Sequence, residues 1–270
     1  TMNVRIIPFK RADAAWNLAL EEALFLKAKQ DLLDGKEVQP VVKMYAFKKP
    51  SVILGYRQRI SEIDYDFCKS VGVDVTMRTT GGGSVYLGKN DLQYSLLLSD
   101  GYSKELLEKI NLGIIASLKD IGFDPQLQIK DMHPVIRMKN KSFVFDAERR
   151  FKNLVLHHGT TLVDDCAYEH MPTSLKATKK ELSDLQTGNL WLKHVQQIKE
   201  KQFVKALEKN LPNNSVIRKN FTNEEIKIAK ELYKKFYTNE EAWKGGKKSF
   251  GICYLPSTIY DMELYAEVDS

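Results

Sequence analysis

The chain has 270 residues, of which 43% are hydrophobic and 28% are charged, and it carries a net charge of +6 at neutral pH. A chain of this length and composition can bury a core, which excludes disordered, collagen-like and small disulfide-scaffold proteins. The mild basic excess suits an acidic partner or an anionic small molecule. The sequence has no Arg-rich recognition helix and no zinc-finger spacing, so we expect no nucleic-acid ligand.

The sequence also indicates the setting in which the protein works. No stretch approaches the ~20 apolar residues of a membrane span, so we expect no membrane association. The first helical stretch carries Glu21 and Glu22 and is therefore not a signal peptide. The three cysteines, Cys68, Cys166 and Cys253, are far apart and odd in number, which favours a reducing, cytoplasmic compartment.

The first half of the sequence alternates short strands with helices. Trp16, Leu20, Leu24 and Ala28 recur at helical spacing, and Asp13 is a suitable N-cap for that helix. In chain order, the predicted elements are a strand at 4–8, a helix at 14–29, strands at 41–46 and 51–54, a helix at 64–70, strands at 71–77, 84–87 and 92–98, and a helix at 104–121.

The second half is predicted as sheet and then helix. Consecutive strands are expected at 135–138, 142–148 and 153–163, and since no helices separate them the sequence favours antiparallel pairing over a doubly wound parallel sheet. Charged helices are expected at 179–186, 192–209 and 223–237, and Pro212 with its neighbours indicates a boundary near 211–215. We therefore predict an α+β domain over residues 1–211 and a small helical segment over residues 212–270.

Three consecutive glycines, Gly81, Gly82 and Gly83, lie between two predicted strands. Glycine there costs entropy and packs nothing, so we expect a backbone that bends freely or approaches a ligand closely. The N–H groups of these glycines, beside Arg78, suit a carboxylate or phosphate, and a tight hairpin without a ligand is the alternative. The stretch from Gly83 to Asn90 approaches the P-loop pattern. Asn90 replaces its Ser or Thr and a strand follows, so we reject that motif.

Four segments resemble motifs of the lipoate–protein ligase family, which is related to biotin ligases and octanoyltransferases. Residues 17–22 resemble its first-helix signature, 52–58 its strand ending in G-x-x-Q, 77–83 its R-R-x-[TS]-G-G-G loop and 157–162 its H-H-G-[TS]-L-L strand. The four motifs follow one another in the family's order. The chain therefore resembles a lipoate–protein ligase A.

The resemblance implies both a fold and a function. The fold would consist of mixed, largely antiparallel sheets flanked by helices, as in class II aminoacyl-tRNA synthetases and biotin ligases, with a mostly helical C-terminal extension. The function would be to attach lipoate or octanoate to a lysine of a lipoyl carrier domain, either a glycine cleavage H protein-like carrier or the E2 lipoyl domain of a dehydrogenase. Ligases of the family use ATP and Mg²⁺, whereas a sibling branch transfers the acyl group between carriers without ATP. A non-catalytic paralogue that binds a lipoylated partner is the third interpretation.

The resemblance also implies which residues bind the acyl substrate. They are Arg78, Thr80, Gly81, Gly82, Gly83 and Val85 around the glycine loop, and His158, Gly159 and Thr160 in the later strand. His157 and His158 are adjacent in a strand and point to opposite faces, so we expect only one of them near the pocket. No other His or Cys stands at metal-ligand spacing, and we expect no metal site.

The family's catalytic-lysine motif is altered in this sequence. If Ala147 and Glu148 align with the end of that motif, Ser142 occupies the lysine position and Lys141 lies one residue earlier. Strand side chains alternate, so we expect Lys141 to point away from the site. The loss of this cation favours transfer without ATP, or binding alone.

Cys166 offers a nucleophile for an acyl-transfer reaction. Two acidic residues precede it directly, Asp164 and Asp165. Their charges would raise the pKa of the thiol and disfavour the reactive thiolate. An ordinary buried cysteine is therefore the favoured interpretation of Cys166.

Overall fold

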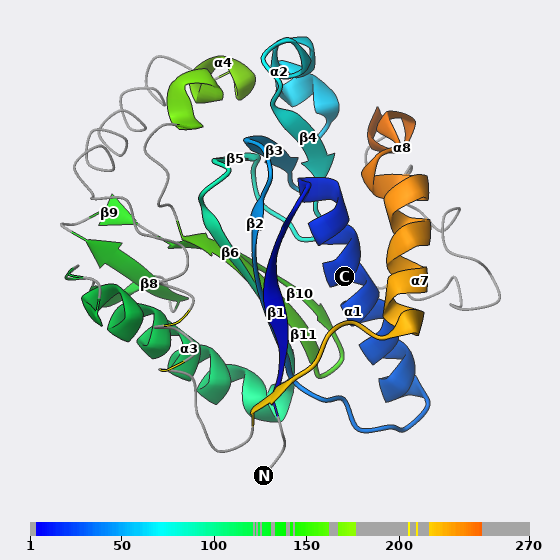
Figure 1. Ribbon diagram of the computed structural model, residues 1–270, viewed down its shortest axis with the longest axis vertical. Helices are drawn as coiled ribbons and strands as arrows, with labels where there is room; N and C mark the ends of the chain where they lie inside the picture. The colour runs from blue at the N-terminus through cyan, green and yellow to red at the C-terminus, as the bar shows by residue number, and fades with distance from the viewer. Residues whose placement is uncertain are drawn as a thin grey trace.

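The computed structural model describes residues 4–120, 122, 124, 126–130, 133–138, 141–142, 144–161, 167–176, 205, 209 and 216–244 (Figure 1). The strands are β1 (Val4–Ala12), β2 (Val41–Phe47), β3 (Ser51–Leu54), β4 (Asp74–Met77), β5 (Val85–Leu87), β6 (Leu92–Ser99), β7 (Gln126–Lys130), β8 (His133–Met138), β9 (Lys141–Ser142), β10 (Val144–Phe151), β11 (Leu154–Thr161) and β12 (Val216–Arg218). The helices are α1 (Ala14–Leu33), α2 (Tyr65–Ser70), α3 (Asp100–Asp120), α4 (Met171–Ser174), α7 (Asn223–Leu232) and α8 (Glu240–Lys244), with short 3₁₀ turns at Ile60–Glu62 and Ala167–His170 and a π turn at Tyr233–Tyr237.

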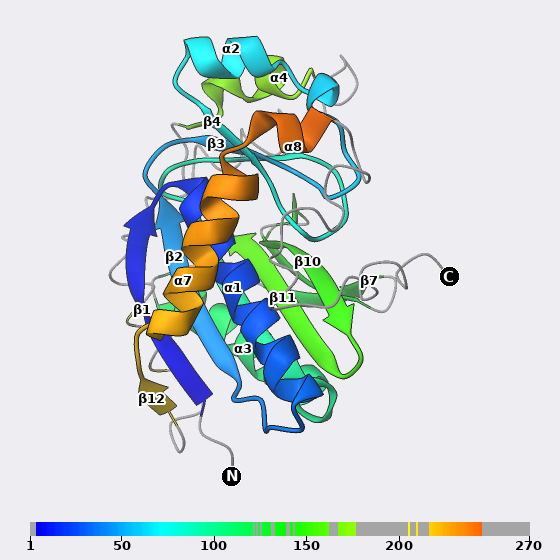
Figure 2. The ribbon, with the colours of Figure 1, turned by 90° about the vertical axis from the view of Figure 1, so that its right-hand side faces the viewer.

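A six-stranded sheet in the order β10-β11-β6-β2-β1-β12 forms the centre of the molecule. The pairs β10–β11, β11–β6 and β6–β2 are antiparallel, whereas β1 runs parallel to both β2 and β12. Helices α1 and α7 cover one face of this sheet and α3 covers the other (Figure 2). The mixed, largely antiparallel architecture predicted from the sequence is confirmed.

Helix α1 positions several polar groups against the sheet. It begins where the Asp13 side chain accepts a hydrogen bond from the Trp16 N–H at 2.7 Å, as the sequence predicted. Because α1 packs against both the sheet and α7, most of the helix is buried, including the charged residues Glu21, Glu22 and Lys29. Buried charges must be paired, so polar partners for these residues are expected beside this helix.

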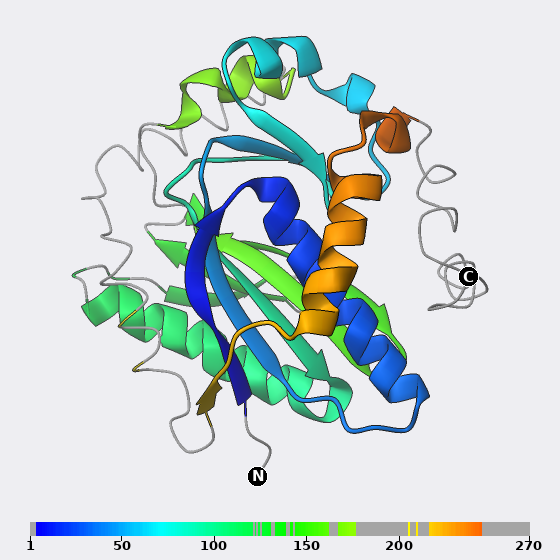
Figure 3. The same cartoon turned by 45° about the vertical axis from the view of Figure 1, so that its right-hand side comes forward.

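A small sheet lies at one end of the central sheet (Figure 3). Its order is β4-β3-β5, with β3 parallel to β4 and antiparallel to β5. The loop between β4 and β5 carries the three glycines and contacts α1, because its Thr79 hydroxyl donates to Glu22. A third sheet, β7-β8-β9, is antiparallel throughout.

The C-terminal segment joins the same core. Strand β12 pairs with the edge strand β1, and α7 packs along α1. Ile228, Leu232 and Phe236 are buried in the main apolar cluster. The boundary expected near 211–215 lies outside the described residues, as do the helices expected at 179–186 and 192–209 apart from residues 205 and 209, both of which are helical.

Some predicted boundaries differ from those of the structure. The strand expected at 71–77 starts only at Asp74, because Gly72 has φ +74° and forms a left-handed turn after α2. The prediction of a single strand over residues 142–148 is wrong, since Ser142 belongs to the third sheet and Val144 to the central sheet. Over the residues that the structure describes, no helix is both long and apolar enough to cross a bilayer.

Candidate functional site

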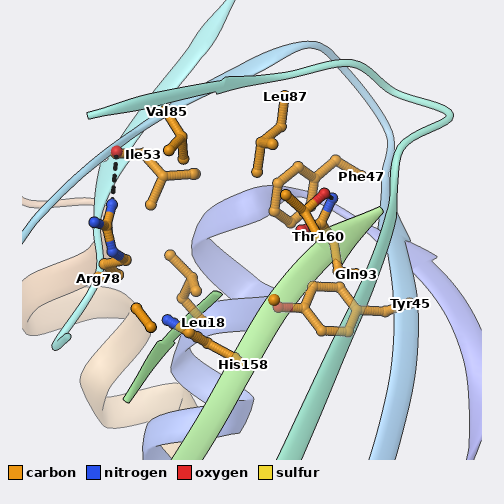
Figure 4. A pocket seen from close by; sticks show the side chains of 12 residues that line it. Leu18, Tyr45, Phe47, Ile53, Arg78, Val85, Leu87, Gln93, His158 and Thr160 are labelled. Carbon is orange, nitrogen blue, oxygen red and sulfur yellow. Dashed lines mark hydrogen bonds between the residues drawn. The ribbon is translucent and has the colours of Figure 1, made fainter. Parts of the chain in front are cut away.

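A pocket opens where the small sheet meets the end of the central sheet (Figure 4). Figure 4 shows Leu18 and His158 on one side of it and Val85 and Leu87 opposite them. Most of its lining is aliphatic or aromatic, and the lining residues are Leu18, Tyr45, Phe47, Ile53, Arg78, Val85, Leu87, Gln93, Ala147, His158, Gly159 and Thr160. Apolar concave sites with a few fixed polar groups are typical of small-molecule binding sites.

Strand β11 supplies three consecutive lining residues. In the antiparallel register His158 lies opposite Ala147 of β10 and Ser95 of β6. His158 faces the pocket, whereas His157 faces the other side of the sheet, where it stacks on Tyr94 and contacts a Glu148 carboxylate oxygen at 3.1 Å. The prediction that only one of the two histidines is near the pocket is confirmed.

Gly159 has a steric reason to be glycine. A Cβ atom at this position would lie 2.4 Å from the Tyr94 hydroxyl oxygen and 2.5 Å from its ring carbon. The Tyr94 ring therefore rests directly against the backbone of β11 on the face opposite the pocket. A side chain here would displace the ring or the strand.

His158 connects three elements through its two ring nitrogens. Its Nε2 lies 2.8 Å from Thr80 Oγ1, and its Nδ1 lies 2.8 Å from Glu21 Oε2. All three side chains are buried. The hydroxyls of Tyr45 and Ser95 both donate hydrogen bonds to Glu21 Oε1. The glycine loop, α1, β2, β6 and β11 are thus joined around one carboxylate.

The charge of Glu21 is balanced within this cluster. Burial by itself would raise the pKa of Glu21, but the attraction of a charged His158, the hydrogen bonds of His158 and Ser95, and the nearby Lys43 outweigh burial and lower the pKa to about 2. Burial lowers the pKa of Lys43 to about 8, against the attraction of Glu21. Lys43 donates to the Asn17 carbonyl at 2.9 Å. Glu21 is therefore a carboxylate at neutral pH.

Arg78 organises the glycine loop from within. One terminal nitrogen donates to the Ile53 carbonyl at 3.1 Å, and the other donates to the carbonyls of Gly81 and Gly83 at 2.7 and 2.8 Å. Burial lowers the pKa of this guanidinium to about 10. Arg78 lines the pocket, but its two terminal nitrogens donate to these main-chain carbonyls. It therefore shapes the loop where the sequence suggested a seat for an anion.

The G-x-x-Q motif forms the turn beneath the glycine loop. The Gly55 N–H donates to the Gln58 side chain at 2.9 Å, and the Tyr56 N–H donates to the Thr80 carbonyl at 2.9 Å. A Cβ on Gly55 would lie 1.8 Å from the Gly82 carbonyl oxygen. Gly82 itself has φ +92°, which favours glycine. Gly55 is thus a residue whose role the sequence did not assign.

The structure brings together only part of the predicted site. Arg78, Val85, His158, Gly159 and Thr160 line the pocket, and Thr80 stands behind it, bonded to His158. Gly81, Gly82 and Gly83 form an exposed rim and do not line it. Leu18 and Glu21, which lie in the first-helix motif, were not assigned to the site from the sequence. An acidic residue such as Glu21 among the apolar residues of a helix was the signal that could have identified it.

The two candidates for the catalytic position lie on a short edge strand. Lys141 pairs with Met138 and Ser142 with Arg137, both in β8. Their side chains lie outside the described part of the chain. Because the chain changes sheets between Ser142 and Val144, alternation along one strand does not decide the direction of Lys141, and the roles of both residues stay predictions.

The remaining site predictions concern metals, nucleotides and cysteines. Among the described residues, no cluster of His, Cys, Asp and Glu could hold a metal ion. The stretch that resembles a P-loop is followed by strand β6, as the sequence predicted. Cys68 is buried in α2, and burial raises the pKa of its thiol. Cys166 and Cys253 lie outside the described residues.

Residues 13–216 match the family model described as the lipoyl protein ligase A/B catalytic domain. The chain belongs to this family, as its motifs indicated. The octanoyltransferase LipM of Clostridioides difficile is 26% identical over 273 residues, which cover 88% of this chain and 97% of that protein. The octanoyltransferase LipM of Staphylococcus aureus is 24% identical, and the match covers 84% of this chain and 94% of that protein.

Solved structures support the same fold. A putative lipoate protein ligase from Thermoplasma acidophilum, with bound lipoic acid, superimposes with a TM-score of 0.69 at 23% identity, covering 91% of this chain and all of that one. A lipoate-protein ligase A bound with ATP gives a TM-score of 0.70 at 22% identity, covering 92% of this chain and all of that one. At this level of identity the similarity establishes the fold, which is the one that the sequence predicted.

Proposed function

We propose that this protein attaches an octanoyl or lipoyl group to a lysine of a lipoyl carrier domain. Membership of the lipoyl protein ligase A/B family supports this function, and so do full-length relatives that are named octanoyltransferases. The observation that carries the proposal is the pocket, whose walls suit an unbranched apolar chain. The structure of a bipartite ligase from Thermoplasma acidophilum with its E2 lipoyl domain supports such a domain as the carrier, and an H protein-like carrier is the alternative.

The polar groups of the pocket are already satisfied within the protein. Gln93 donates to the Thr160 hydroxyl at 2.9 Å and to the Asp91 carbonyl at 3.2 Å. Tyr45 and His158 are both bonded to Glu21. An apolar chain that enters this pocket breaks none of these hydrogen bonds. A hydroxylated chain, in contrast, would bury its own hydroxyl group without a partner. The lining therefore favours octanoyl or dithiolane-bearing chains.

Under this proposal the carbonyl end of the acyl group lies at the glycine loop. Arg78 draws the carbonyls of Gly81 and Gly83 toward itself. Within the described part of the chain, the N–H groups of Gly81, Gly82 and Gly83 donate no hydrogen bond. Free N–H groups at the rim of an apolar pocket suit the oxygen of a carboxylate or thioester.

Two reaction routes are compatible with this site. A ligase would use ATP and Mg²⁺ to activate free lipoate, and a solved relative is bound with ATP. A transferase would take the acyl group from one carrier and pass it to another without a nucleotide, and the curated relatives are named for such transfer. Ser142 at the expected lysine position favours the second route. Either route is consistent with a cytoplasmic enzyme.

The proposal is tested by weighing an acceptor domain. The purified protein is incubated with an octanoyl-loaded carrier and an unmodified lipoyl domain, and separately with lipoate, ATP and Mg²⁺. The acceptor should gain the mass of one acyl group in at least one mixture. Val85→Trp should abolish this gain by filling the pocket, whereas Ile217→Trp, on an exposed position of β12, should not.

An acceptor whose mass is unchanged in every mixture contradicts acyl attachment. Co-migration of the same protein with an acylated carrier would then identify the non-catalytic paralogue that binds a lipoylated partner. Equal loss in Val85→Trp and Ile217→Trp would contradict the assignment of the pocket, because it would indicate a general effect on folding.

A further inference from the structure

The two oxygens of Glu21 have different partners. Oε1 accepts hydrogen bonds from the hydroxyls of Tyr45 and Ser95, and Oε2 faces His158 Nδ1 at 2.8 Å. An ionised carboxylate can only accept hydrogen bonds. The ring nitrogen that faces it must therefore carry a hydrogen, which fixes Nδ1–H on His158.

The other ring nitrogen then determines the direction of the next hydrogen bond. In a neutral imidazole with Nδ1–H, Nε2 carries a lone pair. Thr80 Oγ1 lies 2.8 Å from Nε2, so the threonine hydroxyl donates to the ring when the ring is neutral, whereas an imidazolium would donate to Thr80. The Thr80 carbonyl accepts from the Tyr56 N–H at 2.9 Å, and the residue is thus held from two sides at the entrance to the glycine loop.

We propose that Glu21 is a positioning residue that fixes the tautomer of His158, and that Thr80 and the glycine loop are thereby held against strand β11. Glu21 does not line the pocket and acts through His158, which does. Among the described residues, Lys43 of β2 is the further cation that acts on Glu21. The inference deepens the proposed function and rests on it for the choice of ligand, but the tautomer does not depend on what the pocket binds.

The alternative is that Glu21 is merely a buried charge paired for stability. In that case the state of the His158 ring would not matter to the loop, and any variant that folds would keep the ligand affinity. The tautomer measurement tests whether Glu21 holds the hydrogen on Nδ1, and the ligand affinity of Thr80 variants separates the two interpretations.

The first experiment records ¹H–¹⁵N spectra of the full chain with labelled histidines at neutral pH. The His158 signals are assigned from their absence in His158→Asn. The parent protein should show Nδ1 protonated and Nε2 as an acceptor. In Glu21→Gln the side-chain amide can donate to Nδ1, so the Nε2–H tautomer should increase. A parent with Nε2–H, or a Glu21→Gln spectrum without change, overturns the proposal.

The second experiment measures the affinity of octanoic acid by calorimetry in two pairs of variants. Thr80→Val removes the hydroxyl and keeps the shape, and should weaken binding by about tenfold, the value of roughly one buried hydrogen bond. Thr80→Ser keeps the donor and should restore binding to within about twofold of the parent.

Thr79→Val is the matched control for Thr80→Val. Its hydroxyl donates to Glu22 at 2.8 Å and takes no part in the contacts of His158. Binding by this control should stay within about twofold of the parent. Equal losses in Thr79→Val and Thr80→Val, or no loss in Thr80→Val, overturn the proposal. If the parent itself binds no octanoic acid, the proposed ligand is wrong, and the tautomer measurement still decides the role of Glu21.

Discussion

Gly55 lies closer to the glycine loop than any side chain would permit. Its backbone touches the Gly82 carbonyl, and an added Cβ would stand 1.8 Å from that oxygen and 2.9 Å from its carbon. These are backbone atoms of a loop whose Gly81 and Gly83 carbonyls are held by Arg78, so they cannot move aside cheaply. The sequence showed Gly55 within a motif, but only the structure gives the reason for glycine.

We expect Gly55→Ala to lower the free energy of unfolding by roughly 3 kcal/mol, at the upper end of overpacking costs. The variant should also lose octanoic acid binding, because the loop must shift at the pocket rim. Urea unfolding and calorimetry measure the two effects. The control is Gly83→Ala, where an added Cβ has no neighbour within 4 Å. A Gly55→Ala protein as stable as Gly83→Ala would show that the loop is not held against Gly55.

Most elements were predictable because hydrophobic periodicity and caps are local signals. Helix α1 begins at the predicted Asp13 cap, and β3 has the predicted bounds. Strand β12 was missed, since three residues are too few for a period to show. Its parallel pairing with β1 at the opposite end of the chain is a long-range contact that no local pattern encodes.

The attachment of α7 to the sheet depends on a buried ion pair. Arg5 of β1 donates to both carboxylate oxygens of Glu225 at 2.7 and 2.8 Å, and both side chains are buried. Burial would raise the pKa of Glu225, but the hydrogen bonds and charge of Arg5 and the contacts with Thr222 keep it lowered. Glu225 also completes the capping box with Thr222 that begins the helix.

Glu225→Gln should therefore destabilise the protein by about 3 kcal/mol, since it leaves the Arg5 charge buried without its anion. Glutamine can keep the capping box, so the change isolates the ion pair. Urea unfolding measures the loss. Glu224→Gln is the control, because Glu224 is 64% exposed and lies 3.7 Å from Lys27, a pair worth less than about 1 kcal/mol. Similar urea midpoints of unfolding for Glu225→Gln and Glu224→Gln would contradict a structural role for the buried Arg5–Glu225 pair.

The pocket is assembled from residues that the sequence keeps far apart. Helix α1 gives Leu18, β2 gives Phe47, β5 gives Val85 and β11 gives His158. The motifs identified four of the contributing segments because each has an unusual local composition. The aliphatic lining was not predictable, since Leu18 or Leu87 has the same local pattern as any core residue, and only the packing of the two sheets places it at the cavity.

The cations around the glycine loop bear on whether the protein uses ATP. Adenylation requires a cation to stabilise charge on the α-phosphate in the transition state. Of the described cations near the loop, Arg78 binds three carbonyls, and Arg149 binds both oxygens of Glu22 at 2.7 Å. If Ser142 occupies the position of the catalytic lysine, pyrophosphate exchange by the parent protein should be about 10²–10³-fold slower than by a ligase that has this lysine.

Ser142→Lys should raise the exchange rate, and Lys141→Ala should leave it unchanged. Transfer of octanoyl groups between carriers, measured on the same preparations without ATP, serves as the control that each variant is folded. Rapid exchange by the parent that disappears in Lys141→Ala would identify Lys141 as the catalytic lysine. Because β9 and β10 belong to different sheets, the backbone permits that result. It would replace the transfer route with the ATP-dependent one, whereas slow exchange together with active transfer would leave the nucleotide no role in the reaction.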